Sequence, residues 1–119
     1  MTFALGVPFV DGGLTYLPVF LENASGIPYR MRGDIIFIAK ERDKRKRQTV
    51  TPVEHVPLYV HGSERNTVEK GDPLVQVYVF GNFTLQEGQR MYVHLIEDGG
   101  GRDMTLSFDN RGLLKARTW

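Results

Sequence analysis

The sequence contains no cysteine, which excludes a disulfide framework and thiol chemistry. It has no apolar run near the roughly 20 residues that a helix needs to cross a bilayer. The opening residues MTFALGVPFVDGG also lack the basic region and small-residue cleavage site of a signal peptide. We therefore expect a cytoplasmic protein that does not enter a membrane.

An excess of charge of either sign is missing too, because the formal net charge is +1. Apolar residues make up 41% and charged residues 24% of the chain, the usual composition of a soluble globular protein. A length of 119 residues is enough for one hydrophobic core but not for two. We expect a single domain spanning residues 1–119.

Helical periodicity is absent. The stretch AKERDKRKRQ has helix-forming residues but no apolar face that could be buried. Elsewhere apolar residues alternate with a period of two, and turn signals such as GSERN, EKGDP and DNRG separate the runs. The alternating runs lie at residues 12–22, 34–41, 56–60, 73–85, 90–98 and 103–109. This pattern predicts an all-β fold, a single antiparallel β-sandwich of about seven to eight short strands.

The run VPLYVHGSERN has a proline inside an alternating stretch. Val56, Leu58 and Val60 share one side of an extended chain, and Pro57 lies between them. Proline has no N–H to give to a neighbouring strand, so this segment should be an edge strand or a bulged one. An edge strand next to a turn is a natural docking place for another chain, or else a strand protected against aggregation.

Residues typical of catalysis are not arranged for it. His55, His61 and His94 match no metal-binding spacing, no serine lies in a nucleophile elbow, and Gly99–Gly101 is typical of a hairpin loop. We therefore expect no catalytic residue, no metal and no cofactor, and the chain is not predicted to be an enzyme.

A basic run lies between two of the expected strands, in a charged loop at about residues 40–50. Lys44, Arg45, Lys46 and Arg47 could contact a polyanion in a salt-dependent way. No aromatic residue interleaves with them to stack on bases, so nucleic acid is not favoured as a partner. The alternative interpretation is a solvated loop.

Read in order, six segments resemble the peptide-binding β-sandwich domain of the seventy-kilodalton heat-shock chaperone family. They are LGVPFVDGGLTYLPVF, NASGIP, IIFIA, VPLYVHGSER, FGNFTL and MTLSFDNRGLLKA. The loop KERDKRKRQTVTP is longer than its counterpart in that family, and QEGQRMYVHLIEDGGGRD replaces a proline-rich loop. Neither an ATPase domain before the sandwich nor a helical lid after it is present, so the chain could be an excised fragment of a longer, divergent protein.

The resemblance implies a chaperone-type module that binds extended hydrophobic peptides or unfolded protein segments without covalent chemistry. ATP would then act only in a separate ATPase domain of a longer parent chain. Carried over position by position, the family's peptide-binding groove falls on Val7, Val10, Ile36, Ala39, Val56, Leu58 and Met104. The alternative is a β-sandwich structural or assembly module that uses its edges for protein contacts.

Overall fold

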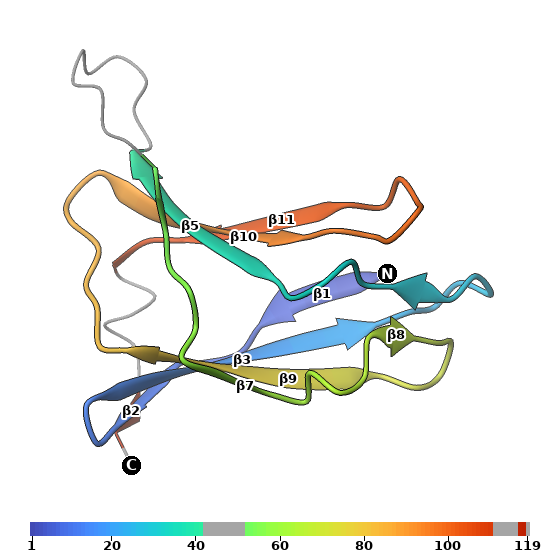
Figure 1. Ribbon diagram of the computed structural model, residues 1–119, viewed down its shortest axis with the longest axis horizontal. Coiled ribbons are helices and arrows are strands. Elements are labelled where there is room, and N and C mark those ends of the chain that lie inside the picture. The colour runs from blue at the N-terminus through green and yellow to red at the C-terminus, as the bar shows by residue number, and fades with distance from the viewer. Residues whose placement is uncertain (42–51, 111–116, 119) are drawn as a thin grey trace.

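The computed structural model describes residues 1–41, 52–110 and 117–118, which form twelve strands (Figure 1). Its central strands are β3 (Leu14–Glu22) and β9 (Leu74–Gly81). Successive side chains of a strand point to opposite faces, so the alternating sequence gives each of these strands one buried face. The side chains on that buried face are Thr15, Leu17, Val19, Leu21, Leu74, Gln76, Tyr78 and Phe80.

The larger sheet is built around this pair in the order β12-β2-β3-β9-β7. Its other strands are β2 (Phe9–Asp11), β7 (Tyr59–His61) and β12 (Arg117–Thr118). β1 (Thr2–Leu5) also pairs with β3, antiparallel, from Thr2 opposite Glu22 to Leu5 opposite Val19. All these pairings are antiparallel except that of β12 with β2.

The smaller sheet has the order β11-β10-β5-β6 and is antiparallel throughout. Its strands are β5 (Ile36–Glu41), β6 (Val53–Glu54), β10 (Gln89–Leu95) and β11 (Met104–Phe108). A separate two-stranded ladder joins β4 (Tyr29–Arg30) to β8 (Thr67–Val68).

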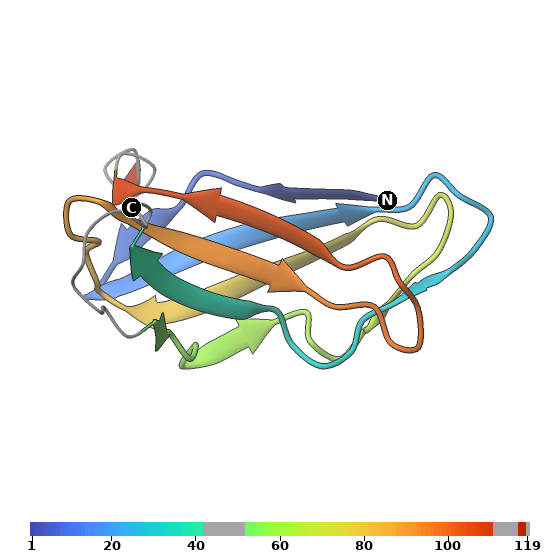
Figure 2. The same ribbon diagram turned by 90° about the horizontal axis from the view of Figure 1, so that it is seen from above.

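The two sheets face each other, with β5, β10 and β11 in one layer and β3, β9 and β7 in the other (Figures 1 and 2). The core between them contains aromatic side chains from both layers. The Phe37 ring of the smaller sheet lies 5.1 Å from that of Tyr78 and 4.9 Å from that of Phe80, measured between centroids. Tilted and edge-on contacts of this kind are the preferred geometry of aromatic pairs.

The predicted all-β antiparallel sandwich is confirmed, and most alternating runs coincide with strands. The run at residues 56–60 is an exception, because β7 begins only at Tyr59 and Pro57 precedes it. β7 is an edge strand of the larger sheet among the described residues. Over the same residues, no helix is long and apolar enough to span a membrane.

One buried polar contact joins the two layers. The Tyr78 hydroxyl, fully buried, donates to Gln76 Oε1 at 2.7 Å and accepts from Ile35 N at 3.2 Å. Burial raises the pKa of Tyr78, so the hydroxyl stays protonated. This bond satisfies an N–H of the smaller layer from a side chain of the larger one.

Replacing Tyr78 with Phe should therefore destabilise the fold. The change leaves Ile35 N–H and Gln76 Oε1 without their partner, which costs about 1–3 kcal/mol. Urea denaturation measures the loss, with Tyr16→Phe as the control because the Tyr16 hydroxyl makes no hydrogen bond to a described side chain or backbone group. Equal stability of the two variants would contradict a structural role for the Tyr78 hydroxyl.

Candidate functional site

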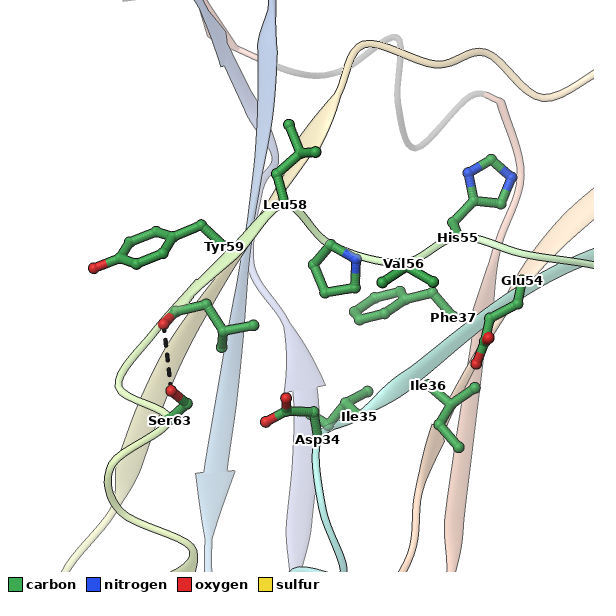
Figure 3. Close-up of a pocket in the computed structure, with 12 residues that line it drawn as sticks. Asp34, Ile35, Ile36, Phe37, Glu54, His55, Val56, Leu58, Tyr59 and Ser63 are labelled. Carbon is green, nitrogen blue, oxygen red and sulfur yellow. Dashed lines mark hydrogen bonds between the residues drawn. The ribbon is translucent and has the colours of Figure 1, made fainter.

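A groove of about 530 Å³ opens on the side of the sandwich where one segment crosses from the smaller sheet to the larger one (Figure 3). One wall comes from the start of β5 and from Glu54 of β6. The crossing segment, residues 55–58, closes one end, and β7 with Ser63 forms the other wall.

The wall at β5 is open because β6 stops pairing early. β6 pairs only with Ile38 and Ala39, and His55 N adds one bond to Phe37 O at 2.8 Å. Continuing this register would place Pro57 opposite Ile35. Proline has no N–H to donate there, so the chain leaves the sheet and the edge of β5 before Phe37 has no strand beside it in the described part of the chain.

The wall at β7 starts with a β-bulge. Leu58 N donates to Val79 O at 2.8 Å, whereas the registered partner of Val79 is Tyr59. Two residues of one strand thus oppose a single residue of the other, and bulges of this kind are common at sheet edges. The bulge leaves the Leu58 side chain outside the core, 69% exposed.

The backbone of Val60 faces away from the larger sheet. In an antiparallel strand, alternate residues direct their backbone groups to opposite neighbours. Asn82, the residue after β9, donates its N–H to Gly13 O, in the register that joins β9 to β3. The even-numbered residues of β9 therefore bond to β3, and the odd-numbered ones, such as Val79, bond to β7. Tyr59 therefore directs its N–H and C=O at β9, and Val60, the next residue, directs its own groups outward. β7 has no further strand beside it among the described residues, so the Val60 N–H is open to a ligand.

The polar end of this wall is Ser63. Its hydroxyl lies 3.5 Å from Val60 O, which is longer than the roughly 2.5–3.0 Å of an ordinary O–H···O hydrogen bond, and the dashed line in Figure 3 marks this contact. Such a weak bond is easily exchanged for one to a ligand.

Apolar side chains stand exposed along the groove. Val56 is 71% and Leu58 69% exposed, while Ile36 is partly exposed and the Phe37 ring is buried behind them. Scattered exposed apolar residues are ordinary, but neighbouring ones that rim a groove are typical of a binding site.

The charges of the groove are of one sign. Asp34 and Glu54 line it, and neither makes an ion pair with a described residue. Among the described residues no Lys or Arg lines it, and burial lowers the pKa of His55, which favours the neutral ring. The groove therefore combines an apolar surface with negative charge.

Three of the seven residues predicted for a peptide groove meet here: Ile36, Val56 and Leu58. Ala39 is buried in the core, and Met104 lies in β11, on the far side of β10 from β5. Val10 belongs to β2, and Val7 precedes that strand and is 52% exposed. The structure thus brings part of the predicted set together and places the rest elsewhere.

Sequence reasoning missed the polar lining, namely Asp34, Glu54, His55 and Ser63. The proline in the run at residues 56–60 was the available signal, since it marks where pairing with β5 must end. The predicted electrostatic residues Lys44, Arg45, Lys46 and Arg47 lie outside the described residues. Within the described residues, no group of His, Asp and Glu side chains is placed to hold a metal ion.

A second polar cluster surrounds Arg102 at the other end of the sandwich. Its Nε donates to Glu97 Oε2 at 2.8 Å, its Nη2 to Pro28 O at 2.9 Å, and its guanidinium lies 5.1 Å from the Tyr29 ring centroid. The Arg102 backbone N–H donates to the other carboxylate oxygen of Glu97 at 3.1 Å. The hydrogen bond from Arg102 lowers the pKa of Glu97, and burial raises the pKa of Tyr29 to about 12.

This cluster fastens the β10–β11 turn to the loop before β4, and its donors and acceptors already serve one another. Because its polar groups already hydrogen-bond to one another, the cluster is a weaker candidate for ligand binding than the open groove.

The fold and the groove define a β-sandwich with an apolar and acidic groove between the exposed edges of β5 and β7. The sequence matches the family described as a domain of unknown function (DUF4138) over residues 1–118, and the chain belongs to that family. Neither the search of curated proteins nor that of solved structures gave a match.

The Arg102 cluster gives a sharp test at Gly100. A Cβ at this position would overlap the Glu97 carboxylate, with the Glu97 Cγ only 2.9 Å away. Gly100→Ala should therefore displace Glu97 from Arg102 and lower the melting temperature by several degrees. Gly101→Ala is the matched control, because a Cβ there meets nothing within 4 Å. In a Glu97→Ala background the penalty of Gly100→Ala should largely vanish, and a penalty that persists would contradict this mechanism.

His55 should make stability depend on pH. Its folded-state pKa is below the unfolded value because of burial, so its contribution is present at neutral pH and is lost as pH falls through the folded pKa. Replacing His55 with Phe keeps a ring against Phe83, whose centroid lies 5.0 Å away, and removes the titration. We expect the loss of stability between pH 7 and pH 5, followed by urea denaturation, to be smaller in this variant. An identical loss in both proteins would contradict the assignment.

Proposed function

We propose that this chain is a non-enzymatic peptide-binding module that holds an extended apolar segment of another protein in the groove between β5 and β7. The observation that carries the proposal is the pairing of exposed apolar side chains, Val56 and Leu58, with the outward-facing backbone of Val60. Strand-like recognition uses these two elements, since backbone bonds give affinity and side-chain contacts give selectivity.

The proposed ligand is a short segment with a central Leu or Ile. Burial of such a side chain is worth about 1.5–3 kcal/mol, and each backbone hydrogen bond adds about 0.5–1.5 kcal/mol. The edge at β7 is only three residues long and offers few such bonds. Binding should therefore be weak, in the micromolar to high-micromolar range, after the cost of ordering the peptide.

Charge should select among apolar segments. Asp34 and Glu54 would face the ligand, and no Lys or Arg of the described part of the chain lines the groove to neutralise them. A Leu flanked by Lys or Arg then fits better than a Leu flanked by Glu, and the preference should fade as salt screens the carboxylates.

Fluorescence anisotropy with labelled heptapeptides tests the proposal. A Leu-centred peptide with Lys flanks should bind, whereas versions with Glu flanks or with Ser in place of Leu should bind at least several-fold more weakly. The double variant Val56→Ser/Leu58→Ser should lose about tenfold in affinity. Both side chains are largely exposed, so the variant should keep its melting temperature.

Ile27→Ser is the matched control, because Ile27 is 69% exposed and lies outside the groove. No binding to the wild type at high-micromolar protein, or equal binding by the double variant, would refute the proposal.

Two biological classes share this chemistry. A module acting on unfolded clients, as the resemblance to the heat-shock chaperones suggests, should bind unrelated Leu-centred, Lys-flanked peptides with similar affinities. A module of a stable assembly should prefer one sequence strongly. A panel of such peptides in the same anisotropy assay therefore separates the chaperone-type role from the assembly role.

A further inference from the structure

The edge strand β7 determines which side chain and which backbone groups meet a bound segment. Val60 is registered with Tyr78 of β9, and directly opposed residues of neighbouring strands point to the same face. Tyr78 is fully buried, so the Val60 side chain also points inward, where it packs against the core and lines the groove. The same residue thus presents its side chain to the groove and its N–H and C=O to the open edge.

The residues on either side of Val60 differ from it in both respects. Figure 3 shows the Tyr59 side chain directed away from the groove. His61, two residues further on, shares that outer face, and its ring centroid lies 4.3 Å from that of Tyr59. Both residues direct their backbone groups at β9, with which they are paired.

Val60 is also bounded by two residues whose backbone bonds to the protein itself. Leu58 N donates to Val79 O at 2.8 Å through the bulge, and Gly62 O accepts from Gln76 Nε2 at 3.3 Å. β7 ends just before Gly62, whose φ of 84° lies in the left-handed region. Val60 is therefore the residue of β7 that offers a new strand both a donor and an acceptor.

A single residue of this kind suits an antiparallel partner. In antiparallel pairing, one ligand residue opposite Val60 exchanges both hydrogen bonds with it. In parallel pairing, the slanted bonds of Val60 would go to two different ligand residues, and the pairing is slightly less stable per residue. The long contact from Ser63 to Val60 O leaves room for a ligand N–H, because a carbonyl oxygen has two lone pairs.

The direction of β7 then determines which end of the ligand lies where. Figure 3 shows Leu58 at one end of this wall of the groove, and Ser63 and Asp34 at the other. An antiparallel segment begins near Ser63 and ends near Leu58. Residues two apart in a strand share a face, so the residue two before the central one points toward Asp34. The residue two after the central one points toward Leu58.

The two ends of the groove differ in character. Asp34 is exposed and makes no ion pair with a described residue. Arg65, two residues after Ser63, does not neutralise it, because its Nη2 lies 3.0 Å from Asp72 Oδ2. Figure 3 shows the other carboxylate, Glu54, on the side of Val56 away from β7. One end of the wall is therefore acidic, and the other carries the exposed apolar side chain of Leu58.

We infer that the bound segment pairs antiparallel with β7 and has the order cation, any residue, apolar residue, any residue, apolar residue. The inference rests on the proposed function. The first apolar residue lies opposite Val60, with its side chain in the groove. A Lys or Arg two residues before it lies near Asp34, and an apolar residue two after it packs on Leu58. The intervening side chains point to the outer face beside Tyr59 and His61, so they select little.

Two capped heptapeptides of equal composition, SKSLSLS and its reversal SLSLSKS, test the direction. Both compete with the labelled Leu-centred peptide in the anisotropy assay, so the label is the same throughout. SKSLSLS should bind at least about threefold more tightly, because the reversal places Lys at Leu58 and Leu at Asp34. Added salt should reduce this difference, since it screens the Asp34 carboxylate.

Asp34→Asn should reduce the preference for SKSLSLS, because it removes the charge at one end of the groove. The matched control is Asp11→Asn, which removes the same charge in β2, separated from β7 by β3 and β9. Asp11 is exposed and lies outside the groove lining, so this variant should keep the wild-type preference. Circular dichroism checks that both variants are folded.

Backbone methylation of the ligand tests the pairing without changing the protein. In the single-Leu peptide SKSLSSS, a methyl on the Leu nitrogen removes the N–H that antiparallel pairing gives to Val60 O, and binding should weaken at least tenfold. A methyl on the nitrogen of the next Ser is the control and should have little effect. In parallel pairing that Ser would be the donor, so the two effects would be exchanged.

The outcomes separate this inference from the proposed function. Equal affinity for the two orders, tighter binding of SLSLSKS, or a methylation effect at Ser instead of Leu would overturn the inference and leave peptide binding established. An unchanged preference in Asp34→Asn would also overturn it. Failure of the wild type to bind either peptide at high-micromolar protein would overturn the proposed function and the inference together.

Discussion

The antiparallel pairing of β3 with β9 is the constraint on which the other features depend. Eight registered pairs, from Leu14 opposite Gly81 to Leu21 opposite Leu74, fix which side chains face inward and which face outward. A shift by one residue would exchange the two faces. In this chain such a shift would still present mostly apolar residues to the core, so buried polar groups add to the preference for the observed register. The Tyr78 hydroxyl accepts from Ile35 N and donates to Gln76 Oε1, and Gln76 Nε2 donates to Gly62 O.

The groove has a different origin, since it arises where pairing fails. β5 is fully paired with β10 on one side but loses its neighbour on the other once the chain reaches Pro57. The bulge at Leu58 then starts β7 in the opposite sheet. The short segment at residues 55–58 thus leaves the edges of β5 and β7 open beside each other, because its backbone pairs fully with neither strand. Its apolar residues, having no core position to enter, remain at the surface.

The alternating runs predicted β3, β5, β9, β10 and β11 because the period of two is a local property of the sequence. The edge character of the segment around Pro57 was also predictable, since proline lacks a donor. The set of residues that meet in the groove was not predictable from the sequence. Ile36 and Val56 meet only because β6 folds back on β5, and Met104 lies elsewhere because β10 stands between β11 and β5. Such neighbours are decided by strand order, which alternation does not encode.

The register of β3 and β9 also bears on how fast the chain can fold. Their paired residues are separated by 53 positions at Leu21–Leu74 and by 67 at Leu14–Gly81, whereas β2–β3 and β10–β11 are local hairpins. Loops of that length must close before the central pair forms, and sandwiches with such distant contacts fold in milliseconds to seconds. During that interval β3 is a nine-residue strand that is apolar on both faces and has no partner on the β9 side. β2 and β1 pair with the other edge of β3, so the edge toward β9 is the one left open to another chain before the central pair forms.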